Sequence, residues 1–328
     1  MGVLKYIKGI SILIFVLLMC LEIQAQDRKS AQFFKPDTTL NKMKVGVVTG
    51  SILTIYGGAL IGLNQYWYKD IPRSRFHFHN DGRDWMQIDK AGHIYSAYFQ
   101  SRWAVGMYRW TGMEDKKAIW VGGMTGTFLQ SSIEILDAFS ADWGFSAWDF
   151  GANVLGSAIV ISQELAWKEQ RISLKISTIP QKYPEGELKN RASDLYGTSL
   201  PELFLKDYNA VTTWASVNIA SFIKRDTRFP DWINIAVGYG ARNMYGGSEN
   251  IWCTEEGTKA GDCPPGMIVD RTDVQRNRQF YISPDIDFTR IPVRRKGFKI
   301  LLNMLNMVKV PFPSLEINTQ GKVRVQPY

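Results

Sequence analysis

Four long apolar segments dominate the first half of the chain. They run over residues 45–63, 90–110, 117–139 and 147–167, and each is long enough for a helix. The first carries no charge and contains five glycines, which allow helices to approach closely. The other three carry charged residues such as Arg102, Glu134 and Asp149. The pattern predicts a bundle of about four apolar helices over residues 40–175.

Aromatic residues gather at the ends of these segments. They are Tyr66, Trp67, Tyr68, Trp103, Tyr108, Trp110, Trp143, Trp148 and Trp167. Tyrosine and tryptophan at helix ends are typical of a membrane interface. Only the first segment is apolar enough to span a bilayer unaided, however. The pattern favours membrane association and leaves a soluble bundle with an apolar core as the alternative.

The second half of the chain alternates between apolar and polar residues, which predicts strands. These strands are expected at 211–223, 232–239, 280–283 and 286–291, with a terminal hairpin over 315–325 that turns at Gln320–Gly321. An apolar helix is expected over 298–310, after the basic residues Arg294 and Arg295. It is either an interfacial membrane anchor or a core helix with solvated flanking charges.

The resulting fold class is α+β. An N-terminal helical bundle over residues 40–175 is followed by a smaller β-rich module over 190–328 with one amphipathic helix. The prolines and glycine of segment 180–186 predict a linker or sharp turn between the two.

The N-terminus predicts a secretory signal peptide over residues 1–25. Lys5 and Lys8 precede an apolar run over 10–21, and a small residue, Ala25, marks the expected cleavage site. A retained membrane anchor is the alternative, although the run is shorter than the roughly 20 residues that span a bilayer. Met19 before Cys20 disfavours lipid attachment at that cysteine. We therefore expect a protein on the periplasmic side of a bacterial cell envelope.

The two remaining cysteines, Cys253 and Cys263, are expected to form a disulfide, because export places them in an oxidising compartment. Unpaired thiols are the alternative. The formal net charge of +8 suits contact with anionic lipid head groups. A nucleic-acid partner is not expected, since the sequence contains no clustered binding motif and the protein is exported.

Three of the apolar segments carry polar pairs at helical spacing. The pairs are Asp89 with His93, Glu134 with Asp137, and Asp149 with Asn153. Lys90 follows Asp89, and Tyr98 lies about one turn beyond His93 on a neighbouring face. Burial of carboxylates in apolar surroundings is costly unless they are paired, protonated or bound to a metal.

This cost suggests a functional cluster. Asp89, His93, Glu134 and Asp149 are candidate acid–base catalysts and candidate ligands of a divalent metal ion. Lys90, Tyr98, Asp137 and Asn153 are candidate binding residues. The alternative is structural, with the pairs linking helices by hydrogen bonds of about 1 kcal/mol each. One histidine is too few to predict a zinc site.

The same residues resemble a known family. Asp89-Lys90-x-Gly92-His93, Glu134-x-x-Asp137 and Trp143-Gly144-Phe145-Ser146-x-x-Asp149-x-x-x-Asn153 are similar to motifs of the YfiM-like family. That family comprises uncharacterised bacterial envelope proteins described as periplasmic lipoproteins, and the resemblance spans residues 40–170. A looser similarity to VanZ-like membrane proteins rests on the Asp-Lys opening and the later Asp-x-x-x-Asn pair. Neither resemblance implies a reaction.

Two functions follow as hypotheses. The first is a membrane-associated envelope protein that binds a lipid, a lipid-linked glycan or a protein partner. The second is a membrane-facing hydrolase or transferase that acts on a lipid-linked envelope substrate through the Asp/His/Glu cluster. A third possibility is a β structure in the outer membrane, formed by the second half of the chain.

Overall fold

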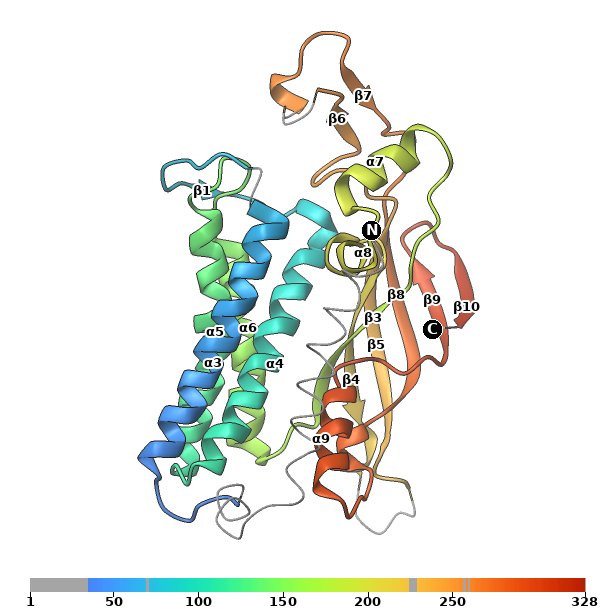
Figure 1. Cartoon of the computed structure of the whole chain (residues 1–328). Coiled ribbons are helices and arrows are strands. Elements are labelled where there is room, and N and C mark those ends of the chain that lie inside the picture. The colour runs from blue at the N-terminus through green and yellow to red at the C-terminus, as the bar shows by residue number, and fades with distance from the viewer. Residues whose placement is uncertain (1–34, 69–70, 224–228, 256–257, 259, 328) are drawn as a thin grey trace, which may run out of the picture.

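A helical part and a six-stranded sheet lie side by side in the protein (Figure 1). The computed structural model describes residues 35–68, 71–223, 229–255, 258 and 260–327. The predicted signal peptide, with Cys20, lies outside the described residues. The predicted α+β fold class is confirmed, with helices first and strands mainly after them.

The four apolar segments of the first half form four helices. They are α3 (Lys42–Leu63), α4 (Ile88–Trp110), α5 (Asp115–Asp137) and α6 (Ala147–Trp167). Helices α4, α5 and α6 pack tightly around a core that contains Tyr98 and Ile119. Glycines permit this: a Cβ at Gly126 would lie 2.1 Å from the Ala97 carbonyl oxygen, and one at Gly156 would lie 2.3 Å from that of Ile94.

Helix α3 lies against the other helices with little burial. Its apolar side chains remain exposed, as in Ile55 (74 %) and Ile61 (69 %). Hydrogen bonds attach it, among them one from the Tyr56 hydroxyl to the Leu129 carbonyl at 2.6 Å. Among the described helices, α3 alone is long and apolar enough to cross a membrane.

The sheet is antiparallel, with the strand order β10-β9-β8-β5-β4-β3. Its strands are β3 (Ile172–Thr178), β4 (Val211–Asn218), β5 (Ile233–Arg242), β8 (Asn277–Ile286), β9 (Pro313–Asn318) and β10 (Val323–Pro327). The turn between β9 and β10 contains Gly321 at φ +74°, so the predicted terminal hairpin is confirmed. Strand β3 was not predicted.

Two predicted elements of the second half are wrong in part. Of the strand predicted over 286–291, only Ile286 is in a strand, as the end of β8. The chain then leaves the sheet, because Asp287 caps a short 3₁₀ helix (Phe288–Arg290) by accepting a hydrogen bond from the Thr289 amide. The helix predicted over 298–310 is α9 (Lys296–Leu305). It ends early because the following segment pairs with β3, where the Ile176 amide donates to the Met307 carbonyl at 3.0 Å.

Helix α9 leaves most of its apolar side chains exposed. They include Phe298, Ile300, Leu301, Met304 and Leu305, whereas Leu302 is buried. This exposure argues against an ordinary core helix and agrees with the interfacial alternative.

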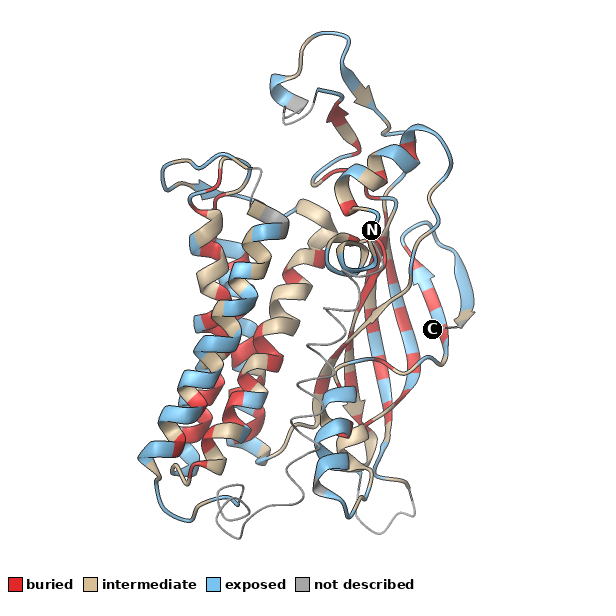
Figure 2. Ribbon diagram, in the orientation of Figure 1, coloured by how far each residue is buried: buried red, intermediate tan, exposed pale blue. Residues whose placement is uncertain are grey.

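The remaining elements form a small extension at one end of the sheet. It contains α7 (Glu187–Tyr196), α8 (Leu200–Lys206), β6 (Ile251–Cys253) and β7 (Ile268–Asp270). A disulfide joins Cys253 to Cys263, which confirms the predicted pairing. Figure 2 shows that buried residues lie between α4, α5 and α6 and alternate with exposed ones along the strands.

Candidate functional site

The start of α4 is fixed by an unusual turn. Trp85, Met86 and Gln87 have φ values of 49°, 50° and 63°, in the left-handed region that side chains other than glycine rarely adopt. The Trp85 ring packs edge-on against Tyr208, with centroids 5.3 Å apart. This contact helps to hold the turn, which directs the first turn of α4, with Asp89 and Lys90, toward α6.

The start of α6 brings the second group of site residues to the same end of the bundle. Ser146 caps the helix, and its hydroxyl accepts a hydrogen bond from the Asp149 amide at 3.0 Å. Ser146 also belongs to β2 (Phe145–Ser146), which pairs with β1 (Phe78–His79). The pairing carries the β1 segment across the helix ends and brings Asp81, two residues beyond β1, into contact with the Ser146 hydroxyl.

Lys90 lies at the centre of the charged cluster. Its ammonium is 2.6 Å from Asp81, 3.2 Å from Asp89 and 3.0 Å from Asp149. The Lys90 side chain is 11 % exposed and that of Asp149 is 6 % exposed. The three carboxylates thus share one buried counter-ion, and charge-assisted hydrogen bonds of this kind are strong in a partly desolvated site.

His93 links α4 to the other two helices. Its Nδ1 lies 3.1 Å from the Asn153 Oδ1 and 3.6 Å from the Glu134 Oε1, and its Nε2 lies 3.9 Å from Asp89. Glu134 is buried, at 1 % exposure. Among the described residues, its Oε1 finds no hydrogen-bond partner, and neither does the Asn153 Nδ2. Orphaned buried polar atoms of this kind suggest that the cluster accepts a ligand, an ion or water.

Two of the predicted binding residues, Asp137 and Tyr98, do not lie at the centre of the cluster. Asp137 lies at the rim of the cluster, where it accepts a hydrogen bond from the Tyr68 hydroxyl at 2.6 Å. Tyr98, predicted as a binding residue, does not join the cluster. It is fully buried in the bundle core, and its hydroxyl reaches the Ile172 carbonyl in β3 at 3.4 Å. Tyr98 lies five residues beyond His93, which is more than one full turn, so its side chain is on a different face of α4 and points to the core.

Sequence reasoning missed two residues of the cluster. Asp81 contacts Lys90 and Ser146, and the Tyr208 hydroxyl donates to Asp89 Oδ1 at 2.8 Å. For Asp81, the only local signal in the sequence was weak: the Asp81–Gly82 pair, which is typical of a turn. No local signal identifies Tyr208, which lies 119 residues from Asp89 along the chain.

Burial and mutual repulsion shift the pKa values of the acids. Burial raises the pKa of Glu134 to about 8, and the charge of Asp149 adds to this, although His93 opposes it. Burial and the charge of Asp89 raise the pKa of Asp149 to about 7. Burial raises the pKa of Asp137 to about 6. At neutral pH, Glu134 is therefore largely protonated.

The pKa values of the cations in the cluster shift in the direction opposite to the one that burial alone would produce. Burial alone would lower the pKa of Lys90, but Asp89, Asp149 and Asp81 outweigh it and raise that pKa. The pKa of His93 is also raised, because the neighbouring carboxylates outweigh its burial. The site therefore holds a permanent ammonium beside an imidazole that gains a proton readily.

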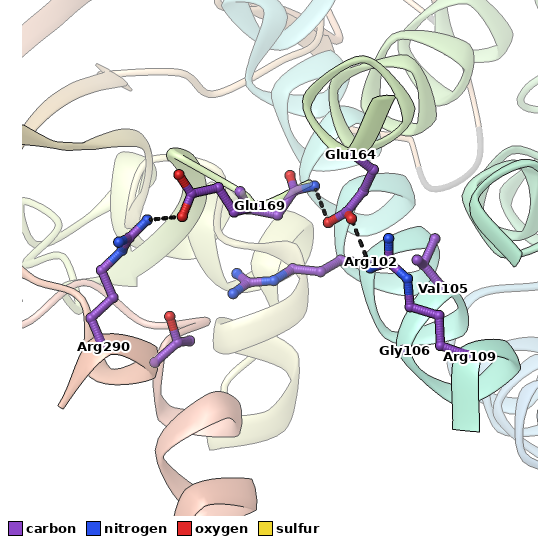
Figure 3. A pocket seen from close by; sticks show the side chains of 9 residues that line it. Arg102, Val105, Gly106, Arg109, Glu164, Glu169 and Arg290 are labelled. Atoms are coloured by element: carbon purple, nitrogen blue, oxygen red, sulfur yellow. Dashed lines mark hydrogen bonds and ion pairs between the residues drawn. The ribbon is translucent and has the colours of Figure 1, made fainter. Parts of the chain in front are cut away.

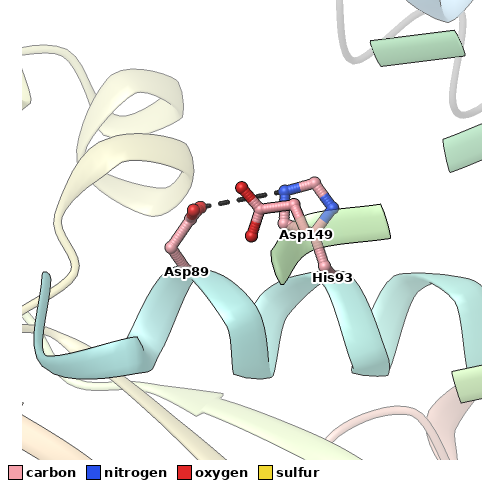
Figure 4. A group of neighbouring side chains, drawn as sticks. All are labelled: Asp89, His93 and Asp149. Carbon is pink, nitrogen blue, oxygen red and sulfur yellow. Dashed lines mark ion pairs between the residues drawn. The ribbon is translucent and has the colours of Figure 1, made fainter. Parts of the chain in front are cut away.

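Asp89, His93 and Asp149 have the ligand types of a divalent cation site. Each offers one ligand atom, and these atoms lie within 4.8 Å of one another (Figure 4). Their oxygen and imidazole donors fit a small divalent ion. The Lys90 ammonium, however, already lies among the same carboxylates, so a metal ion would compete with it. Metal binding stays a prediction.

An exposed aromatic patch adjoins the charged cluster. We define it as Phe76, Phe78, Phe139, Phe145 and Phe150, whose rings contact one another at centroid distances of 5.4–6.2 Å. Phe78 is 71 % exposed, and Phe76, Phe139 and Phe150 are also exposed. Adjoining exposed aromatic rings of this kind are typical of surfaces that contact a membrane or a partner.

A separate polar cavity of about 350 Å³ lies near the other end of α4 (Figure 3). It is lined by Arg102, Arg109, Glu164, Glu169 and Arg290, among others. Arg109 pairs with Glu164 at 2.7 Å, and Arg290 pairs with Glu169 at 3.0 Å. The first pair joins α4 to α6, and the second joins the segment after α6 to the segment after β8. None of the predicted site residues lines the cavity.

Residues 78–163 match the family model described as predicted periplasmic lipoprotein (DUF2279). No curated protein and no solved structure matches the chain. The matched segment contains Asp81, Lys90, His93, Glu134 and Asp149, and hence most of the charged cluster. The expected location on the periplasmic side of the envelope agrees with the family description, whereas the similarity to VanZ-like proteins stays a prediction. Most of the charged cluster therefore lies in the segment that is similar to this family, and the predicted resemblance to an uncharacterised envelope family is confirmed over residues 78–163.

Proposed function

We propose that the protein is a membrane-associated component of the bacterial envelope, which binds the polar head of a lipid or of a lipid-linked glycan at its charged cluster. One observation carries this proposal: the aromatic patch directly adjoins the cluster. An amphiphile needs an apolar contact beside a polar one, and aromatic rings are favoured at the level of lipid head groups.

The β1–β2 pairing supplies the connection. Phe78 pairs with Phe145 in the patch, and the next pair joins His79 to Ser146, which caps α6 beside Asp149. Asp89 and His93, whose side chains are 20 % and 15 % exposed, are accessible members of the cluster, together with Asp81 at 15 %. A head group with hydroxyl or ammonium donors would meet carboxylates there, while its apolar chain lies on the phenylalanine rings.

The exposed apolar surfaces of the bundle support membrane association. Besides α3, outward side chains of α5 and α6 such as Phe128 (71 %) and Leu155 (50 %) are exposed. Soluble proteins rarely expose large contiguous apolar surfaces. We expect the full chain to stay with membranes during a high-salt wash and to leave them in mild detergent. Release by salt alone would contradict the proposal.

Head-group binding is tested by native mass spectrometry. Protein without residues 1–25 is equilibrated with vesicles of phosphatidylethanolamine and phosphatidylglycerol and extracted in mild detergent. We expect a bound lipid whose occupancy falls at least tenfold in Asp89→Asn and His93→Ala, because a hydrogen bond to a charged group contributes about 1.5–3 kcal/mol. Asp115→Asn, an exposed carboxylate at the opposite end of the bundle, is the matched control. Equal occupancy in all variants would refute binding at the cluster.

A second candidate function is hydrolysis or group transfer on a lipid-linked envelope substrate. The observation that favours it is the pairing of a buried acid with a base. Glu134, with a pKa raised to about 8, can donate a proton at neutral pH, and His93 lies 3.6 Å from it. Asp89 and Asp149 would then orient His93 or hold a divalent ion that activates water.

Metal content separates this candidate from a structural cluster. If the cluster holds a divalent ion, protein purified in mild detergent should contain a stoichiometric amount of it. Asp149→Asn and His93→Ala should each lose the ion while circular dichroism shows unchanged helicity. Protein without metal, together with two less stable variants, would instead assign the cluster a structural role.

A further inference from the structure

The six-stranded sheet has apolar side chains on its outer face and polar ones on its buried face. Exposed residues alternate with buried ones along β5, β8 and β9 (Figure 2), and apart from Pro284 and Pro313 the exposed residues are large and apolar. They are Ile235, Val237, Phe280, Ile282, Leu315 and Ile317, joined by Val323 and Val325 of β10, all between 41 % and 73 % exposed. A sheet that faces water on one side normally shows the reverse alternation.

Strand register gathers these side chains into continuous rows. One row crosses four strands as Val237, Ile282, Leu315 and Val325, in which each residue pairs with the next. The neighbouring row is Tyr239, Phe280, Ile317 and Val323. Side chains paired in this way touch across the strands, so the two rows form one apolar surface. We call it the outer sheet face.

The opposite face of the sheet buries charge. The Lys175 ammonium and the Asp285 carboxylate lie 2.7 Å apart, and both side chains are fully buried. Ser216 donates to Asp285 at 2.6 Å, and Glu316 is also fully buried and accepts from Gln279. Most of these polar groups are hydrogen-bonded inside, and the Asp285 Oδ1, which has no hydrogen-bond partner among the described residues, lies 3.9 Å from the Lys309 ammonium. Polar groups inside with apolar ones outside is the arrangement of β-strands that face lipid.

The residues at the two ends of the outer sheet face indicate what kind of surface covers it. At one end Arg278 donates a hydrogen bond to the Tyr239 hydroxyl, which itself donates to the Met86 carbonyl before α4, so this end of the face meets the helical bundle. At the other end Trp232, just before β5, is 39 % exposed. The seven residues from Ile233 to Tyr239 between these ends span roughly 20 Å at the usual rise per residue. An apolar band of about this height, bounded by aromatic residues, is typical of strands in contact with a bilayer.

Charge and position agree with lipid rather than with a protein partner. The outward positions of β5, β8 and β9, all of them described, carry no acidic residue. Lys322 and Arg324 are exposed at the edge of the sheet, where Arg324 is in register with Glu316 of the opposite face. These cations can pair with anionic head groups. Exposed apolar surface also covers α3, on the side of the molecule away from β9 and β10 (Figure 1). A bilayer can cover both sides at once, whereas one partner protein covers one.

We propose that the outer sheet face contacts the acyl chains of a lipid bilayer. The inference goes beyond head-group binding at the bundle, because it concerns a different surface and uses none of the cluster residues. The second half of the chain would then be a membrane-contacting module in its own right. The buried Lys175–Asp285 ion pair would lie on the opposite face of the sheet, away from the lipid.

A fluorescent label tests the contact directly. Cys253 and Cys263 are joined in a disulfide, and the third cysteine, Cys20, is absent from protein lacking residues 1–25, so one new cysteine is the sole free thiol. Ile282→Cys and Leu315→Cys are labelled with an environment-sensitive nitrobenzoxadiazole dye. Thr272→Cys, in an exposed polar turn, is the matched control. Each labelled protein is mixed with vesicles of phosphatidylcholine and phosphatidylglycerol that contain spin-labelled phosphatidylcholine.

We expect a blue-shifted emission and loss of most of the fluorescence at positions 282 and 315, with little change at 272. Quenching by iodide in water at 282 and 315, with no quenching by the spin-labelled lipid, would overturn the proposal. A blue shift without vesicles that grows with protein concentration, together with 282-to-282 crosslinks, would assign the surface to a second copy of the chain instead. Lipid occupancy at the charged cluster is scored separately by mass, so failure of either proposal is distinguishable from failure of the other.

Discussion

Replacement of Lys90 by methionine is expected to lower the free energy of unfolding by about 3–5 kcal/mol, the usual cost of leaving a buried charge without its partner. Lys90 is the common counter-ion of Asp81, Asp89 and Asp149, at distances of 2.6, 3.2 and 3.0 Å. Methionine preserves much of the length and the apolar stem of lysine, so the loss reports mainly the charge. Urea unfolding of the protein in mild detergent, followed by tryptophan fluorescence, measures it.

Two further variants make this expectation specific. Lys117→Met removes an exposed lysine that pairs with Glu114 at 2.9 Å, and it should change stability by no more than about 0.5 kcal/mol. Asp149→Asn in the Lys90→Met background should recover part of the loss, because it removes one of the carboxylates left without a counter-ion. Wild-type stability of Lys90→Met would mean that protons or a bound cation, and not the ammonium, neutralise the cluster.

Local sequence signals predicted the helices well. Segments 45–63, 90–110, 117–139 and 147–167 became α3 to α6 with ends shifted by a few residues, because long apolar runs and their polar limits are properties of the chain itself. The spacing of Asp89 with His93 and of Asp149 with Asn153 likewise placed each pair on one helix face. The structure brings those faces together with Glu134, where α4, α5 and α6 pack closely.

Contacts between distant segments could not be predicted in this way. Tyr208 reaches Asp89 from 119 residues away, and its position depends on the left-handed turn at Trp85 and on the start of β4. Strand β3 was missed because it contains Lys175, a charge that can be buried there only because Asp285 lies beside it. The assumption that apolar residues point inward also fails for the sheet, since alternation shows two faces without showing which one is buried.

Glu134→Gln is expected to stabilise the protein at alkaline pH and to leave it nearly unchanged at acid pH. Glu134 is raised from an ordinary pKa of 4.5 to about 8, chiefly by burial. Between these two values the folded protein keeps a proton that the unfolded chain releases, so the stability of the wild type falls as pH rises across that window. Above pH 8 the wild type has lost the full stability that depends on this proton, roughly 3–5 kcal/mol as judged from the size of the pKa shift of Glu134.

Glutamine carries no charge at any pH, so the variant should avoid this cost. The titratable groups near Glu134 must be considered in the comparison: His93 and Asp89 on α4, Asp149 on α6 and Asp137 on its own helix. His93, whose pKa is raised, also loses its stabilising proton as pH rises, and that slope should persist in the variant. Thermal unfolding from pH 5 to pH 9, with Glu114→Gln at the exposed start of α5 as control, separates the two contributions.

The direction of the Glu134 effect distinguishes two roles for the cluster. A neutral, protonated Glu134 is a hydrogen-bond donor at physiological pH, and glutamine can replace it as a donor but cannot transfer a proton. A variant that is more stable at pH 8 and has lost envelope function would therefore favour acid–base chemistry at the cluster. Stabilisation with function intact would favour binding. A variant less stable than the wild type at pH 8 would show that Glu134 is ionised and held by His93, which would remove the basis for assigning it as an acid.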